Sequence, residues 1–481
     1  MRTCSGAPAS LSAMSRDAAV EWQRNLAAWL VVFVTATLVL VDLVHLAHYA
    51  RDFPLAEDWL MVPALVGEEP SLAGWLWSQN NEHRLPLPRL VHLGLLQLSA
   101  GDFRAGMVAN ILVLAGLGLA LAWLARRLRG GVFRLQDAFF PLALLHLGHW
   151  NNLFWSWQLQ YVLSLVPVCG FLALALTCRT PPGLRWSLGA LAVAIALPLC
   201  GANSLLFAPA LAVWLAAVGT SALRRPAART AGRLCLMAAA IALAGVAAYF
   251  IGFERYDWNP PSPSLRATLR TALRFVAMGL GPGAEVVRWP ASVFTAAALL
   301  GSAALIGWRT LHERADRLRL AGMFCFLGAS ALLAIAIGEG RAAQMPASGM
   351  PDRYALLAVP ALAGTWFSWQ EWGGRFRAAM PALLAIAMVA LLPANVAAGY
   401  SWRNWYVGGM KALELDLAAG RSLEAIAAEH RAFLMHWDEG RLLRALRLLE
   451  HHDLGPVGRR CRSVPAYCDA PDGLPERSPR S

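Results

Sequence analysis

Long apolar runs constrain this chain more than any other feature of its sequence. Each run holds roughly 17 to 25 residues, about the length of helix that crosses the ~30 Å hydrocarbon core of a bilayer. They recur along the chain as far as residue 398. Charged residues make up 15% of the chain, whereas a soluble domain has about 25%. We therefore expect an all-α polytopic membrane protein.

Eleven runs are expected to be transmembrane helices. Their approximate ranges are 27–48, 105–125, 135–150, 158–178, 185–202, 204–220, 234–253, 291–309, 320–338, 354–370 and 379–398. They make up one transmembrane domain, 27–398, which follows a cytoplasmic N-terminal segment, 1–26. The tail, 399–481, is expected to contain two short helices and to end in a disordered segment.

The positions of the arginines predict how the chain is oriented. Cytoplasmic loops of membrane proteins are enriched in Lys and Arg. If the N-terminus is cytoplasmic, the arginine-rich connections all lie inside: 126–134, 179–185, 224–233, 309–319 and 375–377. Eleven crossings then place the tail outside, together with the loops 49–104, 254–290 and 339–353. The use of arginine in place of lysine, with abundant Ala, Gly and Leu, suggests a GC-rich bacterium, so we expect the inner membrane with a periplasmic tail.

The basic charge does not indicate a nucleic-acid partner. The net charge is +12, but the arginines lie between apolar runs and do not form one basic face. No C-x-x-C pair or histidine cluster has the spacing of a metal site, although a divalent metal remains possible. Cys461 and Cys468 lie in the tail, where an oxidising periplasm would permit a disulfide.

The first outside loop, 49–104, carries an acidic pair soon after the first span. Glu57 and Asp58 precede Trp59 in "AEDW" at 56–59, and Glu82, His83 and Arg84 follow later in the loop. A carboxylate at a membrane surface can accept a proton from a hydroxyl, and an indole can stack on a sugar or anchor at the interface. On these residues alone, an ordinary solvated loop is the favoured interpretation, because one acid pair is a weak motif.

The stretch "PLPRLVHLGLLQLSA" at 86–100 allows two interpretations. It could be a twelfth span, but it is short and contains two prolines, an arginine and a histidine. An extra crossing would also move one of the arginine-rich connections to the outside. We therefore expect an amphipathic helix lying on the outer membrane surface.

The order of these parts resembles the GT-C superfamily of integral membrane glycosyltransferases, particularly bacterial enzymes that use polyprenyl-phosphate sugars. The resemblance is carried by "AEDW" at 56–59, "EHRLPLPRLVHLGLLQLSAGD" at 82–102 and "NILVLAGLGLALAWLARRLRG" at 110–130. It covers the first third of the chain, and the rest agrees only in helix count and topology. This chain has His-Arg-Leu-Pro where those enzymes often have His-Pro-Pro, so the subfamily, sugar and acceptor stay open.

The resemblance implies a reaction and site residues. A sugar would pass from polyprenyl phosphate to a hydroxyl of an envelope glycan, lipid or protein, with Asp58 as the catalytic carboxylate that orients or deprotonates the acceptor and Glu57 as its neighbour. The leaving phosphate needs a cation, for which the planar guanidinium of arginine is suited. The remaining candidates for substrate binding are Trp59, Glu82, His83, Arg84, His149, Trp150, Gln158, Arg341, Arg353 and Tyr354.

Two other classes of function remain possible. A transporter or flippase of lipid-linked sugars would occupy the same membrane, but transporters commonly have repeated halves and a polar site near the midplane. No repeat is visible, and the polar clusters lie near the outer ends of the runs. A non-catalytic membrane protein of envelope assembly is not excluded by any residue.

Overall fold

The computed structural model of the protein describes residues 10–256, 260–345 and 349–463. Within these ranges, eight helices are long and apolar enough to cross a membrane: Leu26–Tyr49, Arg104–Leu128, Ser156–Thr177, Ala202–Leu223, Pro226–Phe250, Arg288–His312, Arg317–Arg341 and Gly374–Ala418. The α-helices that form these spans are α1 (Ser10–Tyr49), α5 (Arg104–Leu128), α8 (Leu159–Thr177), α11 (Phe207–Leu223), α12 (Arg229–Phe250), α14 (Arg288–His312), α15 (Arg317–Arg341) and α18 (Ala379–Ala418). The all-α fold class is therefore confirmed.

Three of the eleven expected crossings do not meet these criteria. The segment expected at 135–150 is divided into η2 (Leu135–Ala138), α6 (Phe139–Leu145), η3 (Leu147–His149) and α7 (Trp150–Leu153). It breaks because His146 has an extended backbone, φ −69° and ψ 147°. The segment at 185–202 is α9 (Leu184–Leu199), which at ~1.5 Å per residue reaches only about 24 Å.

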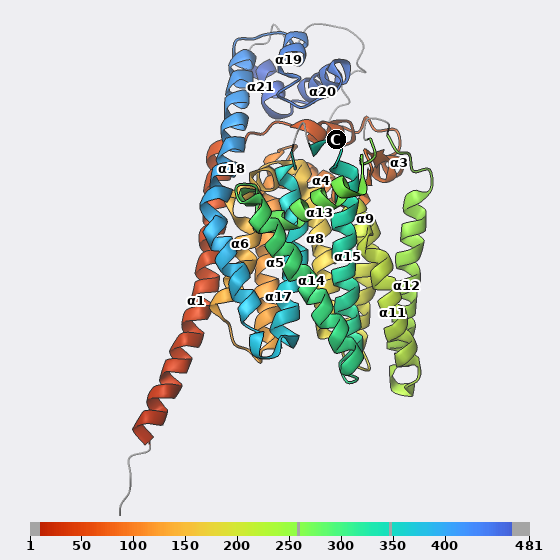
Figure 1. Ribbon diagram of the computed structural model, residues 1–481. Helices are drawn as coiled ribbons and strands as arrows, with labels where there is room; N and C mark the ends of the chain where they lie inside the picture. Colours follow the sequence, from red (N-terminus) through yellow and green to blue (C-terminus); the bar gives the residue numbers. More distant parts are fainter. Residues whose placement is uncertain (1–9, 257–259, 346–348, 464–481) are drawn as a thin grey trace, which may run out of the picture.

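The third segment, at 354–370, is α17 (Ala355–Trp372). Its residues are almost all buried, and its last turns carry Trp369, Gln370 and Glu371. A helix enclosed by other helices does not need an apolar surface toward lipid, so its composition is more polar than that of the outer helices. Figure 1 shows α6, α9 and α17 within the bundle, running alongside the longer helices.

The two ends of the bundle differ in what they carry. The first residues of α1 lie at the lower end of Figure 1, and the tail helices lie at the upper end. The element order places five arginine-rich connections at the lower end, between α5 and η2, α8 and α9, α11 and α12, α14 and α15, and α17 and α18. Positive charge is thus concentrated at the end where α1 begins.

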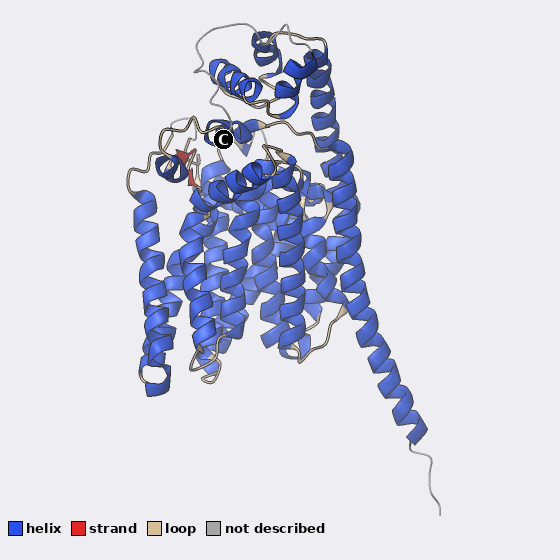
Figure 2. Ribbon diagram, turned by 180° about the vertical axis from the view of Figure 1, so that it is seen from behind, coloured by secondary structure: helices blue, strands red, loops and turns tan. Residues whose placement is uncertain are grey.

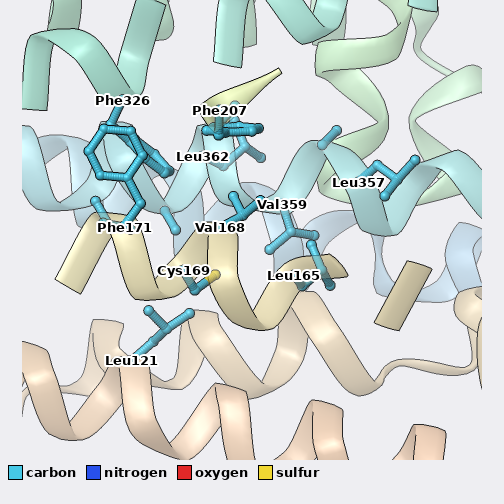
Figure 3. Close-up of a cluster of buried hydrophobic side chains, with 14 of the residues drawn as sticks. Leu121, Leu165, Val168, Cys169, Phe171, Phe207, Phe326, Leu357, Val359 and Leu362 are labelled. Atoms are coloured by element: carbon cyan, nitrogen blue, oxygen red, sulfur yellow. The ribbon is translucent and has the colours of Figure 1, made fainter. Parts of the chain in front are cut away.

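The main hydrophobic core lies between α8 and α17 and extends to α5, α11 and α15. Figure 3 shows side chains from all five helices meeting there. Phe171 of α8 contacts Phe326 of α15 edge-on, with ring centroids 5.6 Å apart. Within a membrane, such close packing supplies much of the attraction between helices, because lipid tails are as apolar as these side chains.

The first loop folds over the upper end of the bundle. It contains η1 (Ala56–Met61), α2 (Val62–Leu65), α3 (Leu72–Trp77), the strands β1 (Gln79–Asn80) and β2 (His83–Arg84), and α4 (Pro86–Leu98). The antiparallel pair β1–β2 is drawn in red in Figure 2, beside the upper end of the bundle. The expected helix at 86–100 is present as α4, and at 13 residues it is too short to span a bilayer.

A second hydrophobic core joins the first loop to the tail. The tail contains α19 (Leu423–His430), α20 (Glu439–His451) and α21 (Gly455–Ser463), which is one helix more than expected. The backbone N–H of Ala56 in η1 donates to the carbonyl of Leu434, 2.9 Å away. The expected domain boundary at residue 399 lies inside the unbroken helix α18. The expected disulfide between Cys461 and Cys468 lies outside the side chains that the structure describes.

The loop expected at 254–290 also contains helices. They are the arginine-rich helix α13 (Leu265–Ala277) and, after it, η6 (Met278–Leu280) and η7 (Pro282–Glu285). The Oγ atom of Ser264 caps α13 by accepting from the N–H of Ala267. The remaining short elements are η4 (Ser156–Gln158), α10 (Ala202–Leu205), η5 (Pro226–Ala228), η8 (Asp352–Tyr354) and η9 (Gly374–Phe376).

Candidate functional site

A small polar cavity lies beneath the first loop, where that loop meets η4, the start of α8, the end of α15 and η8. Its lining residues are Glu57, Asn80, Asn81, Glu82, His83, Gln158, Gln160, Tyr161, Arg341 and Arg353. Four segments far apart in the sequence therefore supply one site. The space open to the centre of a water-sized sphere is about 30 Å³, room for about two water molecules. A larger ligand enters only if the lining moves.

Glu57 is the carboxylate of the acidic pair that faces this cavity. Its side chain is half-buried. Burial raises the pKa of Glu57 above its ordinary value, and the positive charge of Arg353 opposes this shift. A carboxylate with a raised pKa is a better proton acceptor than an exposed one while it remains ionised.

Asp58 is fully buried and does not line the cavity. Its Oδ2 atom accepts from the backbone N–H of Leu55, 3.2 Å away, and so closes the first turn of η1. Burial raises the pKa of Asp58 well above its ordinary value, and the adjacent Glu57 adds to the shift. The catalytic role assigned to Asp58 from the sequence does not fit this geometry, because a substrate in the cavity does not meet its carboxylate.

Trp59 is likewise buried and unavailable to a sugar. Its ring packs edge-on against Phe53, with centroids 5.5 Å apart, in the core that joins the first loop to the tail. The expected stacking of a substrate on Trp59 is therefore replaced by packing inside the protein.

Two arginines form the positive side of the cavity. Arg341 comes from the last turn of α15 and Arg353 from η8. Both guanidinium groups lie over the ring of Tyr354, 5.3 and 5.6 Å from its centroid. In the described parts of the chain, neither arginine has a carboxylate within ion-pair distance. Burial disfavours the charge of Arg353, but Tyr161, Tyr354 and Glu57 nevertheless hold its pKa above the ordinary value.

Two neutral polar groups complete the lining. Burial lowers the pKa of His83 to about 4, and the charges of Arg341 and Arg353 contribute to this. His83 is therefore uncharged near pH 7, and its Nδ1 atom has no hydrogen-bond partner among the described residues. The amide of Gln158 is buried and both of its polar atoms are also unpaired there. Buried polar atoms are normally paired, so these groups are available to a ligand or to water.

Arg84 has a structural role at the edge of the site. Its guanidinium donates to the backbone carbonyls of Tyr249, Trp77, Ile251 and Gly252 over 2.8–3.0 Å. Through these bonds it attaches the β1–β2 hairpin to the end of α12. Arg84 was expected to bind substrate, but its donors are committed to the backbone.

His149 and Trp150 also lie away from the cavity. His149 is buried, stacks on His146 with centroids 4.3 Å apart, and bonds through Nε2 to the carbonyl of Ala143. Trp150 packs against Phe154. Of the aromatic and amide-rich stretch at 146–161, only the end that begins α8 reaches the site.

Four lining residues were not singled out from the sequence: Asn80, Asn81, Gln160 and Tyr161. Asn81 has a positive φ of 51° in the turn between β1 and β2, a conformation that asparagine tolerates. Gln160 and Tyr161 open an apolar helix, and their polar side chains at its first turn were the available signal.

One described group of side chains is close enough to hold a metal ion: Asp416, Glu429 and His430 in the tail. Arg421 already donates to both carboxylates of this group. The guanidinium supplies the positive charge that a cation would bring, and the group lies outside the cavity. The described cavity residues include no comparable cluster.

No family model, curated protein or solved structure matches this chain. The cavity must therefore be interpreted from its own chemistry. It combines one carboxylate of raised pKa, two arginines on one aromatic ring, and unpaired amide and imidazole groups. Such a set can bind a phosphate beside a hydroxyl and accept a proton from the hydroxyl.

Proposed function

We propose that this protein is a membrane glycosyltransferase that moves a sugar from a polyprenyl-phosphate donor to a hydroxyl of an envelope glycan, lipid or protein. The observation that carries the proposal is the cavity in which Glu57 lies beside Arg341 and Arg353. A lipid phosphate at the end of a helix bundle is at the depth where these side chains lie. The resemblance of the first third of the chain to GT-C enzymes agrees with this chemistry.

In the proposed reaction, Glu57 accepts the proton of the acceptor hydroxyl. The hydroxyl oxygen forms a bond to the anomeric carbon of the sugar, and the bond from that carbon to the phosphate oxygen breaks. The bonding electrons leave with the lipid phosphate, whose charge Arg341 and Arg353 stabilise through paired hydrogen bonds. Gln158 and His83 would orient sugar hydroxyls, because their polar atoms are unpaired among the described residues.

The proposed setting is the bacterial inner membrane, with the cavity on the periplasmic side. Arginine-rich connections concentrate at the opposite end of the bundle, and such connections stay in the cytoplasm. Eleven crossings, with α6, α9 and α17 added to the eight long helices, give a cytoplasmic N-terminus and a periplasmic tail.

Transport of a lipid-linked sugar is the main alternative. Transport sites commonly lie near the bilayer midplane, between repeated halves. The cavity lies at one end of the bundle, beneath a loop, which favours transfer over transport.

The proposal is tested in a strain that lacks the gene. Polyprenyl-linked sugar should accumulate in lipid extracts, as measured by mass spectrometry, and the normal gene should remove it. A Glu57→Gln gene should fail to do so, because the amide cannot accept the proton. The matched control is Glu68→Gln, which alters an acid of the same loop outside the cavity.

Glycosyl transfer and transport are distinguished with purified protein in sealed vesicles that contain labelled polyprenyl-phosphate sugar. Transfer of label to an envelope extract supports the enzyme. Movement of label across the bilayer without transfer contradicts it and favours a flippase.

A further inference from the structure

A second polar cavity lies at the other end of the bundle. It has a volume of about 500 Å³, within the range of roughly 300–1,000 Å³ found for ligand sites. It opens between the ends of α5 and α8, the linker at 178–180, the start of α15 and the end of α17. Nothing in the proposed glycosyl transfer uses this cavity.

The charged side chains that line the cavity carry a net positive charge. Three arginines line it, Arg127, Arg179 and Arg319, with two carboxylates, Asp316 and Glu371. Arg319 is bonded to both carboxylates, at 3.0 and 3.1 Å, and also donates to the carbonyl of a residue in α8. Arg319 is therefore the ion-pair partner of both carboxylates, and the three arginines together leave the lining with one positive charge in excess.

Arg127 and Arg179 are left without an acidic partner. No described carboxylate forms an ion pair with either side chain. Arg127 lies over the ring of Trp123, 5.5 Å from its centroid, and that ring is half exposed on the outside of α5. A tryptophan on a helix surface near the membrane boundary anchors at headgroup depth, so the free guanidinium lies where lipid phosphates occur.

The start of α15 adds to the positive potential. Leu318 and Arg319 of its first turn line the cavity, and no side chain caps this turn. Amides at a helix start lack partners within the helix and attract anions. The uncapped start of α15 and the two arginines thus border the same open space.

We propose that this cavity binds a phosphate group, and that the phosphate belongs to an anionic phospholipid of the leaflet on the arginine-rich side. Basic pockets between transmembrane helices on the cytoplasmic side bind anionic headgroups. A headgroup here would join α5, α8, α15 and α17, the helices that also form the main core. The proposal does not depend on the reaction at the opposite end.

The test titrates the purified full-length protein in zwitterionic detergent with phosphatidylglycerol and measures bound lipid by native mass spectrometry. Arg127→Gln and Arg179→Gln should each weaken binding about fivefold, the contribution of one basic residue near an anionic surface. Phosphatidylcholine should bind equally weakly to all forms. Arg225→Gln is the matched control, since Arg225 is exposed at the same end and outside the cavity.

A parallel titration with inorganic phosphate shows whether the cavity binds the phosphate of a lipid or a soluble phosphate. Competition by millimolar phosphate that depends on Arg127 and Arg179 confirms the phosphate site and assigns it to a soluble ligand. Equal binding of phosphatidylglycerol to the normal protein and both variants would overturn the proposal, as would an equal loss in Arg225→Gln. Thermal unfolding of each variant confirms that the compared proteins are folded.

Discussion

At the scale of single residues, Glu57 and Asp58 are adjacent but have different surroundings. Asp58 closes a turn of η1 inside a hydrophobic core, whereas Glu57 faces Arg353 across the cavity. The sequence predicted the region, since an acidic pair after the first span was identified. It could not predict which acid faces the cavity, because in a 3₁₀ turn that depends on contacts with a tail far along the chain.

Loss of charge is expected to abolish transfer at Glu57 and to leave it nearly unchanged at Asp58. Asp58→Asn should preserve transfer within about threefold and cost less than about 1 kcal/mol of stability, because the amide oxygen still accepts from Leu55. Asp58→Ala leaves that buried N–H unpaired and should cost about 1–3 kcal/mol. Glu57→Gln should fold normally and lower transfer by about 10²–10⁴-fold. The measurements are glycan transfer and thermal unfolding of the purified variants, and loss of transfer in Asp58→Asn alone would restore Asp58 as the base.

Transfer is expected to depend on pH through Glu57. A base acts when ionised, so the rate should rise as the pH passes upward through the pKa of Glu57, which lies above its ordinary value. Arg353 opposes that rise in pKa, so Arg353→Gln should move the rising limb to higher pH. Arg353→Lys keeps the charge and should leave the limb in place, while transfer falls because an ammonium cannot form paired hydrogen bonds.

The control for this pH profile is Arg403→Gln, which removes a cation that lies over Tyr400 outside the cavity. The rising limb of the pH profile of Arg403→Gln should match that of the normal protein. An identical limb in Arg353→Gln would show that Glu57 is not the titrating base.

At the scale of elements, local patterns predicted several helices well. The segment 86–100 forms α4, and the tail contains the short helices that were expected, among them α19, which Ser422 caps by accepting from the N–H of Ala425. The hairpin β1–β2 was not predicted, because two-residue strands leave no periodic pattern. It is held by Arg84, three of whose four carbonyl partners lie more than 160 residues away at the end of α12.

Arg84→Gln should loosen this hairpin without unfolding the bundle. The shorter side chain leaves carbonyls of the α12 end and of Trp77 unpaired, at a cost of about 1–3 kcal/mol for each buried group. Hydrogen exchange should become faster at 78–84 and 249–252 while protection of α8 and α17 is unchanged. Arg104→Gln, at an exposed ion pair of the same region, serves as the control. Unchanged exchange at 78–84 would contradict the structural role.

At the scale of the whole molecule, composition and apolar runs predicted the fold class, and eight of the expected spans are present as long apolar helices. The three remaining expected spans have features that hydropathy alone does not predict. The helix α17 is polar at its end because neighbouring helices enclose it, and the segment at 135–150 breaks at His146. Four separate segments line the cavity, so no single stretch of the sequence predicts how they are arranged.

Reporter fusions test the orientation. Fusions at residues 130, 226 and 314, within the arginine-rich connections, should read cytoplasmic, whereas fusions at 68 and 420 should read periplasmic. The reason is the concentration of arginine at the end of the bundle where α1 begins. A cytoplasmic signal at 420 would require an even number of crossings and would separate the tail from the first loop that it contacts.

The bond between Ala56 and Leu434 has a consequence for biosynthesis. The ribosome produces the first loop early and its partner in the tail near the end. At ~5–20 residues per second, the synthesis of these two segments is separated by a time on the order of half a minute. Until then, η1 lacks the part of its packing that the tail supplies, and Glu57 is less firmly held beside Arg353. We therefore predict that chains stopped after residue 420 are inserted but are cut by protease within 53–66, whereas the full chain resists. Catalytic competence would then coincide with completion of the polypeptide, so that an unfinished chain in the membrane would be inactive.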